Sequence, residues 1–349
     1  MKVLVTGGAG FIGGHLVDQL VDHGVDVVVL DSIAPDAHSV DPNHLPPSVD
    51  LRRADVTDAG AVARAVAGVD AVSHQAARVG LGVDFGDIVG YVTDNDLGTA
   101  VLLDGLWRSR FSGRLVVASS MVVYGEGAYR CPRHGSVRAG PRSPASLDAG
   151  QFEPPCPVCG APLAAELIDE QAMLDPRNTY AATKLHTEHL AGVFGREAGV
   201  AVAALRYHNV YGARMPRDTP YAGVASIFRS ALESGRAPRV NEDGSQRRDF
   251  IHVHDVARAN MQALLEHPSA TGPFNIASGD PHTVGELAHQ MAASIDGPRL
   301  EPIITGDWRF GDVRHVTASP ARAAEELGFE AAIGFADGVA DFAQAPLRP

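Results

Sequence analysis

The sequence is poor in cysteine, in aromatic residues and in positive charge. Three cysteines, 6% aromatic residues and 29 Lys or Arg against 42 Asp or Glu give 349 residues a formal net charge of -13. An acidic chain of this kind disfavours nucleic acid and anionic membranes as partners, because both require a basic face that neutralises phosphate. Any anionic ligand must therefore be met by a small number of placed arginines.

The sequence also lacks a long hydrophobic run, although 45% of its residues are hydrophobic, which is enough for a large buried core. The opening residues MKVLVTGGAG enter an apolar strand and a glycine turn. They resemble neither a signal peptide nor a membrane span of ~20 residues. We therefore expect a cytoplasmic protein whose thiols stay reduced.

Short β-branched runs alternate with helical stretches in the first 205 residues. Strands are predicted at 2–7, 26–31, 49–56, 70–77, 113–120 and 199–212, and helices at 11–24, 58–67, 90–110 and 176–198. This alternation predicts an α/β fold with a doubly wound parallel sheet of the Rossmann type. Residues 206–349 predict a smaller, mixed α/β substrate-binding domain, whose segment 245–265 returns to the first domain. An irregular segment at 126–176 interrupts the first domain as an insert.

A glycine-rich turn, GGAGFIG, follows the first predicted strand. Gly7, Gly10 and Gly13 allow a tight turn and let a pyrophosphate approach backbone N–H groups at a helix N-terminus. Asp31 lies 18 positions after Gly13, close to the ~20 expected of a carboxylate that binds the adenosine ribose. An acid at this place repels a 2′-phosphate, so NAD is favoured over NADP.

Tyr180 and Lys184, in the stretch NTYAATK, lie one turn apart on the same face of a predicted helix. An ammonium group at that distance favours the phenolate form of a phenol whose ordinary pKa is ~10. Ser120 ends an apolar strand at the carboxyl edge of the predicted sheet, where ligands of open α/β folds bind. These residues predict an acid–base site at that edge.

In combination, the motifs resemble the extended short-chain dehydrogenase/reductases of the NAD-dependent epimerase/dehydratase family, which act on nucleotide sugars. The resemblance covers nearly the whole chain outside 126–176. It is carried, in family order, by TGGAGFIG, Asp31, ADV (54–56), HQAA (74–77), NDLGT around Asn95, SSMVVYG (119–125), YAATK, LRYHNVYG (205–212), RRDFIHVHDVA (247–257) and WRFGDVRH (308–315).

The resemblance implies an NAD-binding first domain and a set of site residues. NAD would be bound by Gly7, Gly10, Phe11, Ile12, Gly13, Asp31, Asp55, Val56, Gln75, Ala76, Asn95, Tyr180, Lys184 and His208. Ser120, Tyr180 and Lys184 would be catalytic, and Ser120, Asn209, Arg248 and Arg309 would bind the nucleotide-diphosphate sugar. His208 departs from the phenylalanine usual in the family, and a histidine satisfied inside a strand is the alternative. The resemblance also implies a homodimer formed through helices near 90–110 and 176–195.

The two residues after Ser120 discriminate between the reactions of the family. In its 4,6-dehydratases these positions are Asp and Glu, which remove water, whereas here they are Met121 and Val122. Neither side chain donates or accepts a proton, so elimination and decarboxylation are disfavoured. The expected reaction is a 4-epimerisation, in which NAD oxidises C4 and the 4-keto intermediate turns over before it takes the hydride back.

The expected substrate is a dTDP- or UDP-hexose. A CPxHG…CPxCG insert on this scaffold resembles bacterial proteins of the dTDP-L-rhamnose 4-epimerase type. A UDP-glucose or UDP-glucuronate 4-epimerase remains an alternative, as does a nucleotide-sugar 4-dehydrogenase or reductase that consumes external NAD(H). A 4,6-dehydratase and a non-catalytic NAD-binding regulator are less favoured.

All three cysteines lie in the insert, in YRCPRHG and FEPPCPVCG. Both stretches follow one pattern, in which two ligands flank Pro and one further residue and are followed by Gly. Cys131, His134, Cys156 and Cys159 therefore predict a tetrahedral zinc site without an open coordination position, which makes the metal structural. A disulfide is disfavoured by a reducing compartment and by the odd number of thiols. Free buried thiols, which do not explain the repeated turn, and a His134 that is not a ligand remain the alternatives. The insert joins the Ser120 strand to the Tyr180 helix, so it is placed to line or cover the sugar pocket.

Overall fold

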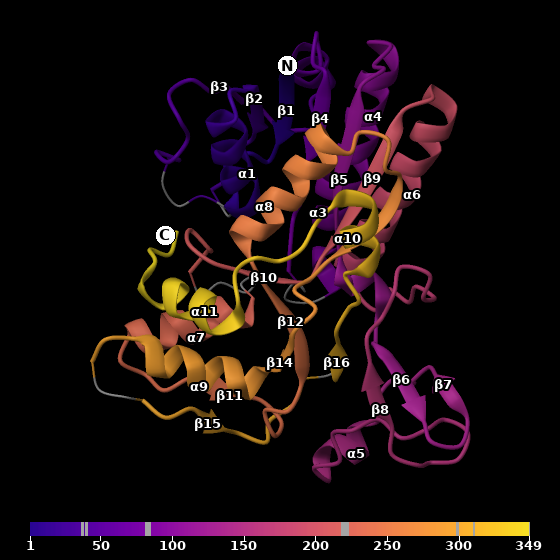
Figure 1. Ribbon diagram of the computed structural model, residues 1–349, viewed down its shortest axis with the longest axis vertical. Helices are drawn as coiled ribbons and strands as arrows, with labels where there is room; N and C mark the ends of the chain where they lie inside the picture. The colour runs from indigo at the N-terminus through magenta and orange to yellow at the C-terminus, as the bar shows by residue number, and fades with distance from the viewer. Residues whose placement is uncertain are drawn as a thin grey trace.

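The protein is built on a seven-stranded parallel sheet. The computed structural model describes residues 1–35, 38, 41–80, 85–217, 223–297, 300–309 and 311–348. The strand order is β13-β9-β5-β4-β1-β2-β3 (Figure 1). The strands are β1 (Lys2–Thr6), β2 (Asp26–Asp31), β3 (Asp50–Arg53), β4 (Ala71–His74), β5 (Arg114–Ser120), β9 (Ala201–Tyr207) and β13 (Gly272–Ile276). The predicted doubly wound α/β fold is confirmed, and the order reverses between β1 and β4, where such sheets bind ligands.

Helices cover both faces of this sheet (Figure 1). The helices α2 (Ala59–Ala65), α4 (Gly98–Arg108) and α6 (Thr179–Ala198) share one apolar core with the strands. The helices α1 (Phe11–Asp22), α8 (Val253–Met261) and α10 (Ala321–Leu327) share the other. The chain enters α4 through η1 (Phe85–Asp87), α3 (Ile88–Tyr91) and a π-helical segment, η2 (Val92–Leu97). Among the described residues, no helix combines the length and the apolar character that a membrane crossing requires.

Local signals place the start and the end of α6. The side chain of Asn178 accepts a hydrogen bond from the backbone N–H of Ala181 at 2.8 Å, and this cap begins the helix at Thr179 rather than at 176. Gly199, with a φ of 67°, ends the helix in the left-handed conformation that favours glycine. Tyr180 therefore lies in the first turn, where it faces the carboxyl edge of the sheet.

The predicted strand 199–212 is wrong as a single element. Its first part is β9 in the main sheet, and its second part, β10 (Asn209–Tyr211), pairs with β12 (Arg247–His252) in a second sheet. The chain changes sheets at His208, whose backbone N–H donates to the carbonyl of Ile276 at 3.1 Å. Apart from Arg206, β9 is apolar and mostly buried, and β10 has only three residues, too few to show a period of their own, so the residue pattern does not mark the change.

The C-terminal lobe has its own small sheets and core. In the second sheet β12 pairs with β10, with β14 (Pro281–Thr283) and with β16 (His315–Val316), and β11 (Arg239–Val240) pairs with β15 (Ile303–Ile304). The helices α7 (Val224–Glu233), α9 (Val284–Ser294) and α11 (Phe335–Gln344) enclose the core of this lobe. After α8, η4 (Gln262–Glu266) leads to β13, so the chain returns to the main sheet through residues 253–276.

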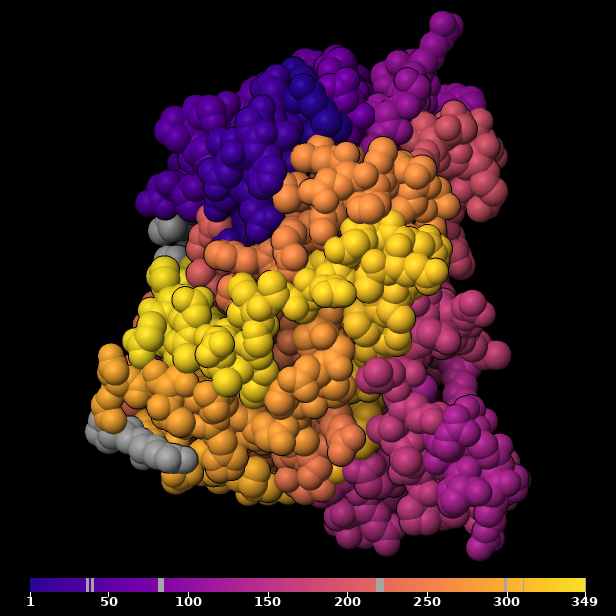
Figure 2. Space-filling view, viewed as in Figure 1, coloured from indigo at the N-terminus to yellow at the C-terminus, as the bar shows by residue number. Residues whose placement is uncertain are grey.

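The insert forms a separate small lobe after η3 (Met121–Tyr124). In it, β6 (Ala128–Cys131) lies between β7 (Gly135–Val137) and β8 (Ala164–Glu166) in an antiparallel sheet, and α5 (Pro144–Asp148) follows β7. Figure 2 shows this magenta lobe packed against the orange C-terminal lobe. The insert therefore has two neighbours, strand β5, after which it emerges, and the C-terminal lobe.

A pair of isoleucine variants tests whether β13, from the C-terminal half of the chain, stabilises the first lobe. Ile276 is fully buried in the main core, whereas Ile304 in β15 is 48% exposed. We expect Ile276→Ala to lower the free energy of unfolding by about 2–5 kcal/mol through the cavity that it leaves. Ile304→Ala should cost at most about 1 kcal/mol. Denaturant unfolding of both variants makes the comparison, and equal losses would contradict a structural role for β13.

Candidate active site

The predicted site residues gather at the carboxyl edge of the main sheet. Gly7 follows β1, Gln75 follows β4, and Ser120 ends β5. Ser120 is in register with Tyr207 of β9, so His208 comes next to it. Since parallel strands end at one edge, residues far apart in sequence are brought together there.

The structure brings Ser120, Tyr180 and Lys184 together. The Ser120 hydroxyl is hydrogen-bonded to that of Tyr180. The Nζ of Lys184 donates to the backbone carbonyl of Ala118 in β5 at 2.8 Å and lies 6.0 Å from the centre of the Tyr180 ring. A hydroxyl, a phenol and an ammonium group thus share one buried corner, which is the set that a proton transfer at a sugar hydroxyl requires.

The pKa of Tyr180 differs from the sequence-based expectation. Burial raises this pKa to about 12, while the hydrogen bond to Ser120 lowers it and the neighbouring Tyr91 raises it. Burial lowers the pKa of Lys184 to about 8, against the attraction of Glu188. In the protein alone, the cost of burying a charge outweighs the effect of Lys184, whose Nζ is committed to Ala118. Tyr180 is therefore neutral at pH 7 in this state.

A buried ion pair that the sequence reasoning missed supports this corner. The Ser119 hydroxyl donates to Glu188, and Arg206 donates to the same carboxylate from Nε at 2.9 Å and from Nη2 at 2.8 Å. Arg206 and Glu188 are 3% and 8% exposed. Two signals could have indicated the pair, because Glu188 follows Lys184 at helical spacing and Arg206 interrupts an otherwise apolar strand.

The glycine turn is shaped for a phosphate group. Gly7 has a φ of +68°, and a Cβ there would lie 2.6 Å from the backbone nitrogen of Ala76. A Cβ on Gly13 would lie 2.2 Å from the carbonyl oxygen of Gly7. Gly10, the N-cap of α1, has no side chain that could bond the first N–H groups of the helix, at Phe11 and Ile12. Such a terminus fits the pyrophosphate of a dinucleotide.

Asp31 is held beside this turn. Its carboxylate accepts hydrogen bonds from the backbone N–H of Ala9 at 3.0 Å and of Ile33 at 2.9 Å. A carboxylate has further lone pairs with which it can bind ribose hydroxyls. Arg348, which the sequence reasoning also missed, donates to the carbonyl of Ala9 at 3.4 Å. The C-terminal residues of the described chain thus reach the glycine turn, a contact without any local sequence signal.

Two of the predicted NAD contacts, Asn95 and Gln75, use their side-chain amides in hydrogen bonds within the protein. Asn95, in the π-helical segment, bonds both to the backbone of Arg78 and to the hydroxyl of Thr183. The Nε2 of Gln75 donates to Ser73, Tyr207 and Asn260. These side chains hold the loop after β4 against its neighbours, and a π segment is common at such functional places.

Asp55 and Val56, two further predicted NAD contacts, lie in the turn that follows β3. One oxygen of the Asp55 carboxylate accepts from the N–H and the hydroxyl of Thr57, at 2.8 and 2.7 Å. The side chain of Asp55 is exposed and that of Val56 is buried. Val56 packs so closely on Gly98 that a Cβ there would lie 2.6 Å from it.

His208 and Asn209 carry buried polar atoms without hydrogen bonds. Within the described residues, neither ring nitrogen of His208 nor the Oδ1 of Asn209 has a partner of normal geometry. Burial lowers the pKa of His208 to about 4, against opposing contributions from Asp249 and Asn275, so the ring is neutral. Buried unpaired polar atoms are rare, and their position next to Ser120 makes both residues candidates for ligand contacts.

Arg248 contacts the backbone of the stretch of chain to which Arg309 belongs. The guanidinium group of Arg248, in β12, donates to the carbonyls of Val313 at 2.8 Å and Arg314 at 2.9 Å. Arg309 is exposed, and its carbonyl accepts from the N–H of Asp312 at 3.3 Å. In the described part of the chain, its guanidinium group makes no hydrogen bond. Phe310, in the same motif, lies outside the described residues.

The four predicted metal ligands converge in the insert. The Sγ of Cys131 lies 3.8 Å from that of Cys159 and 3.5 Å from the Nδ1 of His134, and the Sγ of Cys156 lies 3.6 Å from that same nitrogen. Tetrahedral zinc with ordinary bond lengths separates its ligands by roughly 3.5–3.8 Å. A disulfide requires sulfurs about 2.05 Å apart. The geometry of this Cys₃His cluster therefore fits a metal ion.

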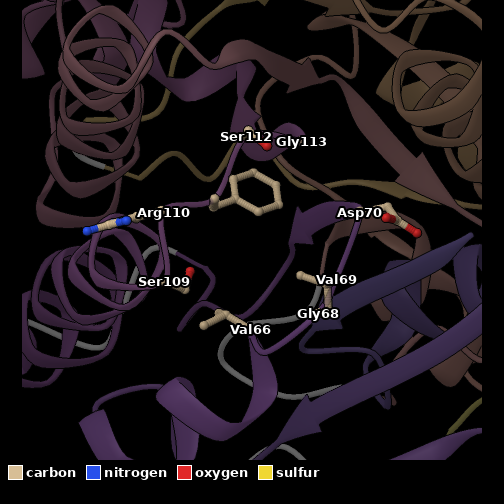
Figure 3. A pocket seen from close by; sticks show the side chains of 9 residues that line it. Val66, Gly68, Val69, Asp70, Ser109, Arg110, Ser112 and Gly113 are labelled. Atoms are coloured by element: carbon tan, nitrogen blue, oxygen red, sulfur yellow. The ribbon is translucent and has the colours of Figure 1, made fainter.

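One hollow of the described surface lies away from these groups. It has a volume of about 350 Å³ and is lined by Val66, Asp70, Ser109, Arg110 and Phe111, among others. Figure 3 shows these side chains around the beginnings of β4 and β5. That is the edge of the sheet opposite to Ser120, so this hollow does not belong to the candidate site.

Comparison with known proteins agrees with this geometry. The NAD dependent epimerase/dehydratase family matches residues 3–147 and 157–277. A dTDP-L-rhamnose 4-epimerase of Burkholderia thailandensis is 32% identical, over 94% of this chain and 90% of that protein. A dTDP-glucose 4,6-dehydratase of Streptomyces niveus is 30% identical, over 98% and 91%.

A solved structure provides the corresponding comparison in three dimensions. The UDP-glucose 4-epimerase of Thermus thermophilus, solved in complex with NAD, has a TM-score of 0.76 and 29% identity, over 98% of both chains. The protein thus belongs to the NAD dependent epimerase/dehydratase family, and it is an NAD-dependent enzyme of the epimerase type.

Proposed function

We propose that the protein is a nucleotide-sugar 4-epimerase. The observation that carries the proposal is the corner of Ser120, Tyr180 and Lys184, together with the two aliphatic residues that follow Ser120. The relatives include a dehydratase beside the epimerases. Met121 and Val122 support the epimerase reaction, because neither can serve as the acid or base that an elimination of water needs.

Tyr180 is proposed to take the proton of the C4 hydroxyl and to return it after the sugar has turned over. Ser120 holds that hydroxyl through its own oxygen, and Lys184 favours the tyrosinate. When bound, NAD supplies the acceptor and then the donor of the hydride. Burial keeps Tyr180 neutral in the protein alone, so a positive nicotinamide ring held beside it would favour its ionisation.

The predicted cofactor residues divide into three kinds of contact. The uncapped helix after Gly10 is proposed to hold the pyrophosphate, and Asp31 the adenosine ribose. Lys184 and the unpaired ring of His208 are proposed to lie against the nicotinamide end. Asn95 and Gln75 are proposed to act mainly as props, because their amides are already bonded within the protein.

The proposed substrate is a dTDP- or UDP-hexose, with dTDP-L-rhamnose the first candidate. Asn209, Arg248 and Arg309 are the residues proposed to bind its diphosphate. The similarity to the Burkholderia thailandensis enzyme supports a dTDP sugar. The fold shared with the Thermus thermophilus enzyme keeps UDP-glucose as the second candidate.

The Cys₃His cluster is proposed to hold a structural zinc ion. Both knuckles have a glycine in the left-handed region after the second ligand, Gly135 with a φ of 68° and Gly160 with a φ of 70°. In the first knuckle, the N–H of Arg133 points at the Sγ of Cys131 at 3.4 Å, which suits a charged thiolate. Four protein ligands leave no coordination position for substrate. The free thiols fit a reducing compartment such as the cytoplasm.

A homodimer is proposed through the helices α3, η2 and α6. Val89, Val92, Leu97 and Val193 of these helices are between 43% and 72% exposed. Large apolar side chains exposed on helices that contact one another favour an interaction surface there. A second copy of the chain that uses the same surface would bury them in a two-fold symmetric contact.

The function is tested by incubating the purified protein with dTDP-L-rhamnose, UDP-glucose and UDP-glucuronate and following C4 by NMR. We expect one of them to be converted to its C4 epimer without added NADH. A 4-keto-6-deoxy product formed with loss of water would contradict the proposal. A stoichiometric demand for external NAD(H) would instead indicate the dehydrogenase alternative.

Tyr180→Phe should lower the turnover rate at least about 10²-fold, because no other group at C4 takes the proton. Tyr211→Phe is the matched control, since the Tyr211 hydroxyl is buried without a hydrogen bond among the described residues. Initial rates at saturating substrate make the comparison. Loss of activity in both variants would point to a general effect on folding.

Metal analysis tests the zinc site. The wild-type protein should carry about one zinc per chain. His134→Ala should lose most of it, whereas His289→Ala, at an exposed position outside the cluster, should retain it. Wild-type protein that contains no zinc when prepared without chelators, and takes none up, would refute the site.

The oligomeric state tests the helical surface. Leu97→Asp should yield a monomer in analytical ultracentrifugation at micromolar concentration, because a charge in an apolar contact is not compensated. Ile303→Asp, at an equally exposed position in β15, should leave the dimer intact. A monomeric wild type would disprove the proposed dimer.

A further inference from the structure

The insert holds segment 308–315 on both sides of Arg309. Before it, the indole Nε1 of Trp308 donates to the carboxylate of Asp148, in α5, at 3.0 Å. After it, the guanidinium group of Arg142 donates to the carbonyl of Asp312 at 2.8 Å. Arg309 therefore projects from a stretch of chain that is tied to the insert at each end.

A buried cluster of charges strengthens the second attachment. Arg314 is 1% exposed, and its Nε donates to Glu153 of the insert at 2.8 Å, while its Nη1 donates to Glu242 and Asp243 of the C-terminal lobe at 2.7 and 2.8 Å. Arg142 pairs with the same Glu242 at 2.8 Å. The buried guanidinium group of Arg314 requires such pairing, so the position of Arg314 is closely specified.

Glu153 also fixes the following residue, His315. The Nδ1 of His315 accepts from the backbone N–H of Arg247 at 3.0 Å, so the proton of a neutral ring lies on Nε2. That nitrogen donates to the second oxygen of Glu153 at 2.9 Å. The carboxylate of Glu153 therefore holds two consecutive residues of the segment. The backbone N–H groups of both residues donate to the carboxylate of Glu126.

The place of Glu153 is in turn coupled to the metal cluster. Only Pro154 and Pro155 separate it from Cys156, and proline fixes its own φ at about −65°. The backbone of Cys156 is closed by a hydrogen bond to Ala161 at 2.8 Å. A change in the position of Cys156 is therefore transmitted to Glu153 through a short and stiff connection.

We propose that the insert is a positioning element for the diphosphate site, in which the Cys₃His cluster, through Glu153, Arg142 and Asp148, holds the segment that presents Arg309 to a nucleoside diphosphate. This inference rests on the function proposed above and assigns the insert a part in substrate binding. Arg248 contributes from the other side, since its guanidinium group holds the carbonyls at 313 and 314.

The experiment measures the binding of UDP and of dTDP by calorimetry to the protein with its NAD retained. Glu153→Gln removes the charge that pairs with Arg314. It should weaken the preferred nucleotide roughly three- to tenfold. The control is Glu166→Gln, because the carboxylate of Glu166 pairs with Arg130 and Ser136 within the insert and, among the described residues, contacts none of residues 308–315. It should bind like the wild type.

A positioning role predicts more than weaker binding. With the preferred nucleotide sugar, Glu153→Gln should raise KM by the same factor, with little change in kcat and in the NAD content of the purified protein. Removal of zinc from the wild type by a chelator should weaken the nucleotide similarly, and added zinc should restore it. Removal of zinc from Glu153→Gln should add little, since both changes act through one connection.

Each outcome decides a different point. If the wild type binds neither UDP nor dTDP, the proposed function fails and the inference falls with it. If the wild type binds one of them and Glu153→Gln binds it equally well, the inference is overturned and the proposed function stands. If Glu153→Gln is purified without NAD or unfolded, Asp148→Ala, on the exposed face of α5, replaces it with the same expected loss of affinity. An unchanged affinity in that variant would also overturn the inference.

Discussion

The site depends on one constraint, which is that all seven strands of the main sheet run in the same direction. Their carboxyl ends form a single edge, and every strand delivers the residue that follows it to that edge. Gly7, Asp31, Ser120 and His208 lie at or just after the ends of four different strands, and all four are therefore at this edge. The helix that carries Tyr180 crosses this edge at its first turn, because Asn178 caps it there.

Burial sets the electrostatic character of that edge. Tyr180 and Lys184 both have their pKa shifted toward the neutral form, to about 12 and about 8. Tyr180 is therefore uncharged at pH 7 in the protein alone, whereas Lys184, with a pKa of about 8, stays mostly protonated. At the same edge, the ring nitrogens of His208 and the Oδ1 of Asn209 are buried without a hydrogen bond of normal geometry within the described residues. An arrangement of this kind stabilises a bound ligand more than it stabilises the protein alone.

The parts of this account that could be predicted from sequence are those with local signals. The glycine turn, the carboxylate at the end of the second strand and the repeated Cys-Pro turns are each defined by a few neighbouring residues. The change of sheets at His208 could not be predicted, because the strand after it has only three residues, too few to show a period of their own. The pKa of Tyr180 was expected in the wrong direction, because it depends on burial that the spacing to Lys184 does not reveal. The attachments of the insert could not be predicted from the sequence either, since Glu153 and Arg314 are 161 positions apart in the chain.

The central claim is that a hydride leaves C4 and returns to it within one site. Conversion of the preferred nucleotide sugar, labelled with deuterium at C4, tests this most directly. The account predicts a C4 epimer that retains the deuterium at C4, with no NADH added. A product that has lost the label from C4, or that has lost water, would contradict it.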